Sequence, residues 1–156
     1  MSSPRSFGRG WSCAAFIAPV LAIVLAATAY AAAGVTALDA PGTPIKLEQL
    51  KLLNTDASPM VLLYGATNQT DTTIDQFTVT VLIFDKDKRL KARQVAPGRR
   101  TLNGRETKFS AMVLDVGAID AADTLVAGVD QSQAVGSDDW WRADLRTLAE
   151  AMMSKK

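Results

Sequence analysis

Two aspartates separated by one residue are the strongest candidates for metal chemistry in this sequence. Asp85 and Asp87 have the D-x-D spacing that opens a calcium-binding loop, in which alternate positions supply oxygen ligands. The next alternate position holds Arg89, and neither a glycine nor a distal glutamate follows at loop spacing, so an EF-hand is excluded. Because an Asp side chain accepts hydrogen bonds from the backbone of a turn, we expect Asp85 to close a turn instead.

The chain lacks the residues on which most enzymatic and metal chemistry depends. It contains no histidine, which removes the commonest general base and the usual transition-metal ligand. Its one cysteine, Cys13, lies in the N-terminal segment, and zinc sites are rarely built from carboxylates alone. A serine nucleophile paired with lysine would need an S-x-x-K motif, which is absent. We therefore predict a protein that is not an enzyme and has no catalytic residues, cofactor or metal.

Positive charge is concentrated between residues 86 and 108, where nine Lys and Arg residues fall. Alternation places Arg89, Lys91 and Arg93 on one face of a strand. Such a face could dock on an anionic partner or membrane, where each cation contributes about 1 kcal/mol. Alternatively, these charges protect an edge strand from pairing with other sheets. The net charge of +1 gives no indication of nucleic-acid binding.

The tail, residues 136–156, contains a second set of candidate binding residues. Residues 137–139 (SDD) are good N-cap and first-turn residues. Apolar residues follow at i, i+4, i+7 and i+11, namely Trp141, Leu145, Leu148 and Met152. This spacing predicts one amphipathic helix, whose stripe either packs on the sheet or docks a partner. For docking, Trp140 and Trp141 are the kind of aromatic anchors that interfaces prefer.

The N-terminal segment, residues 1–33, predicts export. Residues 10–38 carry no charged side chain and follow Arg5 and Arg9, which is the layout of a secretory signal with A-x-A cleavage sites between Ala27 and Ala33. Alternatively, residues 13–33 stay as a membrane anchor, since a span needs about 20 residues. Under either reading the chain after about residue 40 lies outside the cytoplasm, either free in the periplasm or held at the plasma membrane.

Short β-like segments separated by turn residues fill the middle of the chain. Residues 34–44 are rich in Gly, Pro and small residues and predict a linker. The strands are expected at 45–53 with a bulge, and then at 60–67, 75–84, 88–95, 106–114 and 125–129. In the third strand the apolar face is formed by Phe77, Val79, Val81 and Ile83, and the polar face by Gln76, Thr78 and Thr80. We therefore expect that strand to be buried on one side only, as in an antiparallel sheet.

The strand after the Asn103-Gly104 turn also alternates. ETKFSAMVL places Phe109, Ala111 and Val113 on one face, and Lys108, Ser110 and Met112 on the other. About six strands without any βαβ alternation predict an antiparallel β-sandwich over residues 45–135, preceded by the linker and followed by the tail helix. A core of that size is expected to be stable without disulfides.

Three short motifs between residues 60 and 131 resemble the FxLYD-type domains, small immunoglobulin-like sandwiches of exported and membrane-anchored prokaryotic proteins. They are the strand end VLIFD (81–85), the Asn-x-Thr turn NQT (68–70), and LNGRETKF (102–109), which resembles a Leu-x-Pro-Gly-Glu turn. Lys88, Asn103 and Ala66 depart from the residues usual at those positions. The resemblance implies an all-β, immunoglobulin-like sandwich of six to seven strands without a catalytic site, and no functional residues carry over.

Two functions are compatible with these features. In the first, the chain is an exported, non-enzymatic protein of the cell envelope whose sandwich binds or scaffolds a protein partner. In the second, it is a membrane-anchored accessory subunit of an envelope complex, with its basic face toward the membrane or an anionic partner. The candidate binding residues are Trp140, Trp141, Arg89, Lys91 and Arg93.

Overall fold

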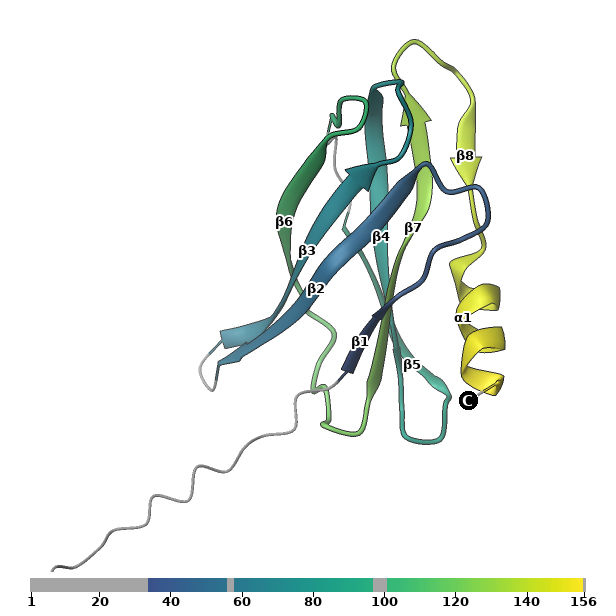
Figure 1. Cartoon of the computed structure of the whole chain (residues 1–156). Helices are drawn as coiled ribbons and strands as arrows, with labels where there is room; N and C mark the ends of the chain where they lie inside the picture. The colour runs from purple at the N-terminus through teal and green to yellow at the C-terminus, as the bar shows by residue number, and fades with distance from the viewer. Residues whose placement is uncertain (1–33, 56–57, 97–100, 156) are drawn as a thin grey trace, which may run out of the picture.

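The computed structural model describes residues 34–55, 58–96 and 101–155, which form a two-sheet β-sandwich with a helix on one outer side (Figure 1). In chain order the elements are β1 (Gly34–Ala37), β2 (Ile45–Thr55), β3 (Ser58–Asn68), β4 (Ile74–Phe84), β5 (Leu90–Ala96), β6 (Thr107–Val113), β7 (Thr124–Ala134), β8 (Trp140–Arg142) and α1 (Leu145–Ser154). The all-β architecture agrees with the alternating sequence patterns. The predicted signal or anchor of residues 1–33 lies outside the described residues, and no helix in the described part is long and apolar enough to cross a membrane.

Five strands form one sheet and three form the other. The larger sheet has the order β1-β7-β4-β5, and β8 also pairs with β7. The smaller sheet has the order β2-β3-β6. Every pairing is antiparallel except that of β1 with β7, which is parallel from Gly34↔Thr124 to Ala37↔Ala127. The larger sheet is therefore mixed rather than purely antiparallel as predicted.

The predicted linker of residues 34–44 is part of the fold. Its first four residues form β1, and the backbone of Leu38 continues the pairing by donating to the Ala127 carbonyl at 2.8 Å. The four residues GVTA have small side chains and pair with the edge of β7, whose backbone groups would otherwise be unpaired there. The Pro and Gly residues that follow do make a turn, with Gly42 at φ 73° and Ala40 buried beside it. The folded domain thus includes residues 34–44 and does not begin only at Ile45.

The bulge predicted in residues 45–53 is present in β2. Pairing with β3 shifts register between Glu48 and Lys51, and Gln49 takes a left-handed φ of 52°. A bulge adds a residue to one strand and so changes which side chains share a face. Before it, Ile45 and Leu47 point into the sandwich; after it, Leu50 and Leu52 pack on the same core.

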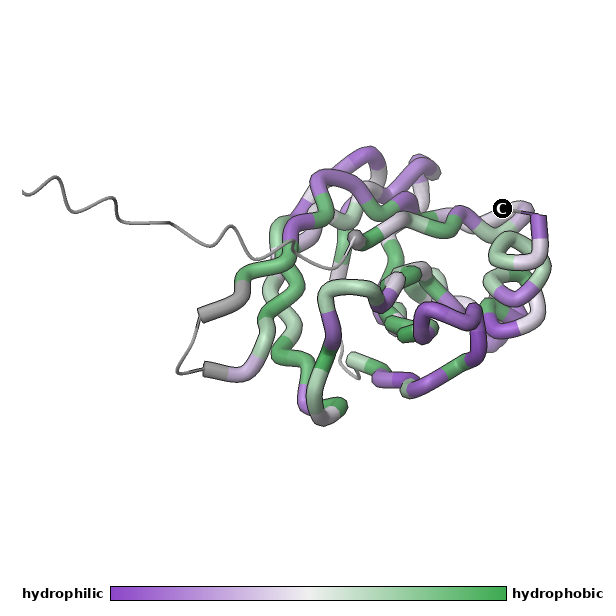
Figure 2. Tube along the Cα trace, turned by 90° about the horizontal axis from the view of Figure 1, so that it is seen from below, coloured by the Kyte–Doolittle hydropathy of each residue, from purple (hydrophilic) through white to green (hydrophobic). Residues whose placement is uncertain are grey.

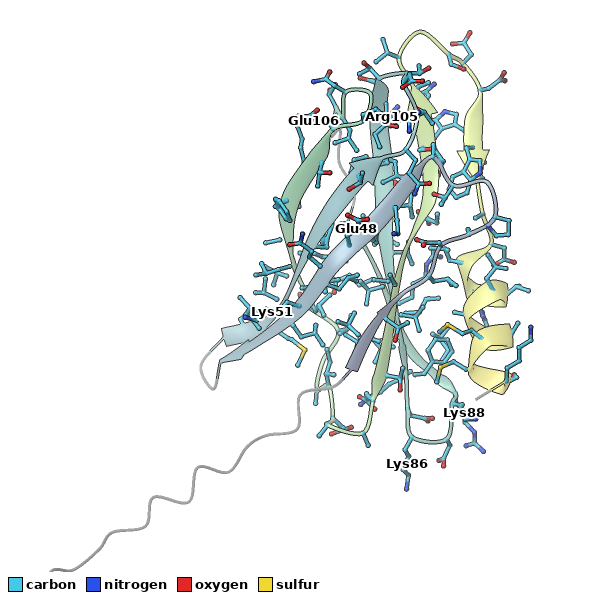
Figure 3. The ribbon with its side chains drawn as sticks, viewed as in Figure 1. Glu48, Lys51, Lys86, Lys88, Arg105 and Glu106 are labelled. Atoms are coloured by element: carbon cyan, nitrogen blue, oxygen red, sulfur yellow. The ribbon has the colours of Figure 1, made fainter. Side chains whose placement is uncertain are left out.

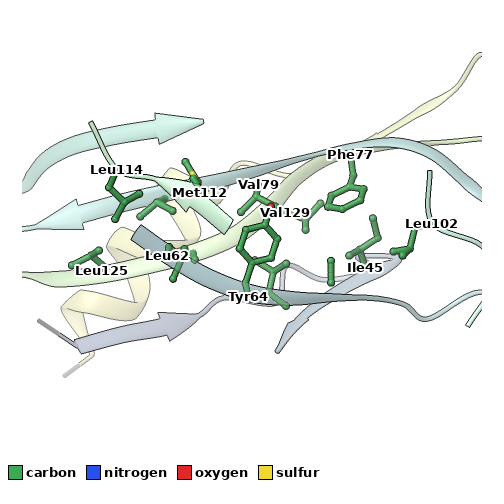
Figure 4. Packing of buried hydrophobic residues seen from close by; sticks show 14 of the residues in the cluster. Ile45, Leu62, Tyr64, Phe77, Val79, Leu102, Met112, Leu114, Leu125 and Val129 are labelled. Atoms are coloured by element: carbon green, nitrogen blue, oxygen red, sulfur yellow. The ribbon is translucent and has the colours of Figure 1, made fainter. Parts of the chain in front are cut away.

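The main core lies between the two sheets and combines residues from both layers (Figure 4). Tyr64 and Leu62 of β3 face Val79 and Val129 of the larger sheet, and all four are less than 4% exposed. The inward side chains of β4 are those expected from the alternation: Phe77, Val79, Val81 and Ile83. At full burial each such side chain contributes roughly 1.5–3 kcal/mol, which makes this cluster the principal source of stability.

The outer face of β4 is also buried, contrary to the prediction of a strand buried on one side. Thr78 and Thr80 are 8% and 1% exposed, and Leu82 and Phe84 on the same side are fully enclosed. The cover of Leu82 and Phe84 is α1, whose Leu145, Ala149 and Met153 form a second core with these two residues. Figure 2, which views the sandwich from below, shows α1 on the far side of the larger sheet from the β2–β3 hairpin. A helix some 60 residues downstream therefore sets the burial of β4.

The tail does not form one continuous helix. Ser137 accepts a hydrogen bond from the Asp139 N–H at 3.1 Å and so closes a turn rather than starting a helix. Trp140 and Trp141 then extend as β8, opposite Gln133 and Ser132 of β7. The helix begins eight residues later than residue 137, where Asp144 caps it by accepting from the Thr147 N–H at 3.1 Å. Aromatic residues favour strands, and here they extend the sheet before the helix can start.

The Asn-x-Thr motif forms a turn that connects distant segments. Asn68 is fully buried, and its Nδ2 lies 2.8 Å from the Thr72 carbonyl and 3.1 Å from that of Leu102. Its Oδ1 accepts from the backbone N–H of Thr70 at 2.9 Å. The side chain therefore holds the β3–β4 turn against the chain that leads into β6, which is a structural role for the motif.

Candidate functional site

The two basic residues of β5 are neutralised within the domain. Lys91 Nζ lies 2.8 Å from a carboxylate oxygen of Asp120 and 2.8 Å from one of Asp123. Arg93 pairs more loosely with Asp130, at 3.3 Å. Figure 3 shows two other cations of the run, Lys86 and Lys88, in the turn at the end of β4. The predicted basic face is thus present on an edge strand, but much of its charge is already paired.

The contacts around Lys91 shift the ionisation of the groups involved. Hydrogen bonds from Lys91 to Asp120 and then Asp123 raise the pKa of the lysine. Burial of Asp123, whose side chain is 3% exposed, would raise its pKa, but the Lys91 ammonium and the Asp120 N–H outweigh it and hold that pKa below its ordinary value. Both groups therefore stay charged around neutral pH, and the trio fastens β5 to the loop before β7.

Asp85 closes a turn, as expected from its position. Its Oδ1 accepts from the backbone N–H of Asp87 at 2.8 Å and from that of Arg89 at 2.9 Å. Arg89 lies just before β5, in this turn, rather than on the strand with Lys91 and Arg93. Among the residues described, no three Asp or Glu side chains gather where they could hold a metal ion.

The two tryptophans lie on a strand and are half-buried. Trp141 packs against both cores, so much of its indole is engaged inside the domain. Trp140 is its neighbour on β8, opposite Gln133, and neither lies on α1. Their proposed role as partner anchors stays a prediction.

A groove lies beside β6. It has a volume of about 540 Å³ and is lined by Phe77, Thr101, Thr107, Lys108, Phe109 and Ser110. Hydroxyl groups are present, but none of the described lining residues is an acid or imidazole that could act as a general base. Lys108 is the one amine among these residues, and its Nζ is engaged by the Thr101 carbonyl at 2.6 Å and by Glu106 at 3.4 Å rather than by a hydroxyl group. The groove therefore offers apolar and hydroxyl contacts.

The outer face of the three-stranded sheet was not identified from the sequence. Four rows of side chains cross it, each with one residue from β2, one from β3 and one from β6, and together they are called the open face. In order, the rows are Lys46, Thr67 and Thr107; Glu48, Gly65 and Phe109; Lys51, Leu63 and Ala111; and Leu53, Val61 and Val113. Polar residues fill the first row and apolar residues the fourth, so the face changes character along the strands.

The apolar residues of the open face are exposed. Phe109 is 67% exposed, Val113 50% and Leu53 38%, and no described segment covers them. The Phe109 ring leans over Gly65, where a side chain would meet its Cε1 at 3.0 Å. The inward side of β6 is instead the one with Met112 and Leu114, which are buried in the core. The more apolar of the two faces of β6 therefore points outward.

Polar contacts border the apolar part of the open face. Thr67 and Thr107 hydroxyls lie 2.8 Å apart, and Lys46 pairs with Glu48 at 3.3 Å. At the other end, Gln94 of β5 donates to the Val113 carbonyl at 2.7 Å and accepts from the Asp115 N–H at 2.7 Å. This bridge joins the end of β6 to β5 and occupies backbone groups there. The side chains of the open face are therefore more accessible to a partner than the backbone at this end of β6.

The signal for the open face was present in the sequence but ambiguous. The alternation of Phe109, Ala111 and Val113 predicts a strand, yet period 2 alone does not say which face is inward.

Comparison of the chain with protein-family models, with curated proteins and with solved structures finds no match, so the resemblance to FxLYD-type domains stays a prediction.

Proposed function

We propose that this chain is an exported, non-enzymatic protein of the cell envelope whose immunoglobulin-like sandwich binds a protein partner through the open face. The observation that carries the proposal is the exposure of Phe109, Val113 and Leu53 on one sheet face. Contiguous exposed apolar residues with a polar border are typical of interaction surfaces, whereas single exposed apolar residues need no explanation.

Export is supported by the N-terminal segment and by the domain's independence from cysteine. Residues 10–38 carry no charge and follow two arginines. The domain that begins at Gly34 contains no cysteine, so its stability does not depend on the redox state of the compartment. The FxLYD-type motifs point to the same class of exported sandwich with a binding role.

The alternative is an anchored accessory subunit whose basic face meets the membrane or an anionic partner. This alternative is favoured by the apolar segment 13–33, which ends directly before β1. It is weakened by the ion pairs of Lys91 and Arg93, which would have to be exchanged for new ones. The Lys91–Asp120 and Arg93–Asp130 pairs are partly exposed and contribute only about 0–1 kcal/mol each, so exchanging them adds little affinity. Separating Lys91 from Asp123 would leave a buried carboxylate without its counter-charge. The exposed apolar side chains of the open face carry no charge, so binding through them requires no exchange of this kind.

The test is site-specific photo-crosslinking in the cells that make the protein. A photoreactive phenylalanine analogue at position 109 should give a covalent adduct with a protein, and Val113→Lys should abolish it by placing a charge on the same face. Val135, which is 54% exposed in the turn before β8, is the matched control position and should give no such adduct. Equal labelling from positions 109 and 135, or none from 109, would refute the proposal.

A further inference from the structure

The two central rows of the open face are complementary to each other. One row holds Glu48, Gly65 and Phe109, and the next holds Lys51, Leu63 and Ala111. Glu48 in one of these rows and Lys51 in the other occupy the β2 position of their rows and have opposite charges. On β6, the large Phe109 and the small Ala111 likewise occupy the same position in the two rows. Two such surfaces would therefore be complementary in charge and shape if the Glu48 row of each lay on the Lys51 row of the other.

This arrangement depends on the bulge in β2. Glu48 and Lys51 are three residues apart, so a regular strand would place them on opposite faces. The register shift between them returns Lys51 to the outer face, opposite Leu63. Figure 3 shows Glu48 and Lys51 along β2. The bulge therefore places an acid and a base in adjacent rows of the same face.

We infer that the partner bound on the open face is a second copy of this chain, a deepening that rests on the proposed function. A two-fold axis in the plane of the face, perpendicular to the strands and between the two central rows, lays each row on the other row of the second copy. Glu48 then meets Lys51 of the second copy, and Phe109 meets its Ala111. By symmetry each contact occurs twice, as closed dimers require.

The outer rows fit the same operation. The row of Lys46, Thr67 and Thr107 meets the apolar row of Leu53, Val61 and Val113 of the second copy. The methyl groups of the threonines and the aliphatic stem of Lys46 cover those apolar side chains, while the ammonium group stays in water. Two sheets packed in this way are about 10 Å apart with their strands within about 30° of alignment, as in other sandwiches.

The size of the face predicts a weak dimer. Three strands about 4.8 Å apart, with four rows about 7 Å apart, give a footprint on the order of 14 by 28 Å, or roughly 400 Å². This is about half of the roughly 800 Å² that each partner buries in a standard interface, and it belongs to the size class of weak, transient associations. We therefore expect a dissociation constant in the micromolar range, so that occupancy depends on the local concentration of the chain.

A charge-exchange cycle tests the pairing. The full chain, in the processed form that cells hold, is studied by analytical ultracentrifugation from roughly 1 µM to 1 mM, in detergent if the N-terminal segment is retained. Glu48→Lys and Lys51→Glu should each weaken dimerisation by about tenfold, because each creates two like-charged contacts. The double variant, Glu48→Lys with Lys51→Glu, should return the dissociation constant to within about threefold of wild type.

The matched control is the Arg146–Glu150 pair on α1, whose atoms are 2.8 Å apart and which lies on the opposite side of the sandwich. Exchanging either of its charges should leave the dissociation constant unchanged. Circular dichroism of each variant confirms that the fold persists, since Glu48 and Lys51 are both on the surface.

The outcomes separate this inference from the proposed function. A monomer at all concentrations, or a double variant no tighter than the singles, overturns the dimer. If position 109 then crosslinks to a different protein, the open face is still a binding surface and only the identity of the partner is wrong. If position 109 crosslinks to no protein, both proposals fail, and an adduct with lipid would favour the membrane-anchored alternative.

Discussion

The outer faces of the two sheets both carry apolar side chains, but only one of them has a cover among the described residues. On the larger sheet, Phe84 and Leu82 lie beneath Leu145 and Met153 of α1, and all are nearly inaccessible. On the smaller sheet, Phe109 and Val113 point outward with no described segment over them. Within one chain, a phenylalanine on an outer sheet face is therefore 0% exposed in one layer and 67% in the other.

This difference shows how the chain treats apolar sheet surface. Where the tail supplies a cover, the face gains a core of its own and contributes to folding. Where no described segment supplies one, the free energy of burying the apolar side chains remains available for association. The covered face thus acts as an internal reference for what a partner would do on the open face.

Replacing Phe84 by alanine should produce the largest loss of stability. Its side chain is fully buried between β4 and α1, and removing a buried aromatic ring costs about 3–5 kcal/mol through lost burial and the remaining cavity. Denaturant unfolding of Phe84→Ala and Phe109→Ala compares the free energy of unfolding that each ring contributes. If Phe84→Ala cost no more than Phe109→Ala, α1 would not be a tight cover in solution.

Glycines on the two faces should respond differently to an added methyl group. At Gly128, a Cβ would lie 2.8 Å from the Leu38 carbonyl oxygen and 3.0 Å from Leu145, so backbone or helix must move. Such overpacking costs about 1–3 kcal/mol. At Gly65, the nearest atom belongs to the exposed Phe109 ring, which can turn away, so Gly65→Ala is the control and should be close to neutral. Equal unfolding midpoints for the two variants would contradict this contrast.

The sequence predicts most of the strands but not the covering of the sheets. Alternation correctly identifies the inward face of β4 through Phe77 and Val79, and the bulge in β2 is confirmed. The same rule cannot show that Thr80 and Phe84 are buried, because their cover comes from a helix distant in the sequence. Period 2 separates two faces of a strand and leaves the choice between them to tertiary packing.

The candidate site was missed for a related reason. Charged residues and tryptophans attract attention as binding residues, yet Lys91 is held by Asp120 and Asp123, and Trp141 is packed on both cores. Both are local features whose partners lie elsewhere in the chain. The open face consists of ordinary strand residues, and only the pairing of β3 with β2 and β6 brings them together.

Replacing Phe109 by alanine should barely change the stability of the monomer. The ring is mostly exposed and its main contact is Gly65, so the expected loss is less than about 1 kcal/mol. Association should weaken, because aromatic residues at the centre of an interface contribute most of its affinity. Unfolding at low concentration and ultracentrifugation at high concentration separate the two effects. A large loss of monomer stability would mean that the open face belongs to the folding core.

The smallest effect on stability is expected at the N-terminus of α1, the helix that covers the larger sheet. The Asp144 carboxylate accepts from the Thr147 hydroxyl at 2.8 Å and from its backbone N–H at 3.1 Å, and these bonds, the hydroxyl first, hold the pKa of Asp144 below its usual value. A lowered pKa in the folded state means that ionised Asp144 stabilises the fold above the unfolded pKa of about 3.9. This contribution is lost as the pH falls through the lower, folded value.

Asp144→Asn tests the effect because asparagine also caps helices but does not titrate. Thermal unfolding is measured for both proteins from about pH 6 to pH 3. The unfolding midpoint of wild type should be higher than that of Asp144→Asn near pH 6, and this difference should shrink below about pH 4. Other acids titrate in both proteins and cancel in the difference. Since α1 covers only the larger sheet, the dissociation constant of the dimer should be the same for the two proteins at pH 6. A pH-independent difference in stability would show that the charge of Asp144 does not hold the cover in place.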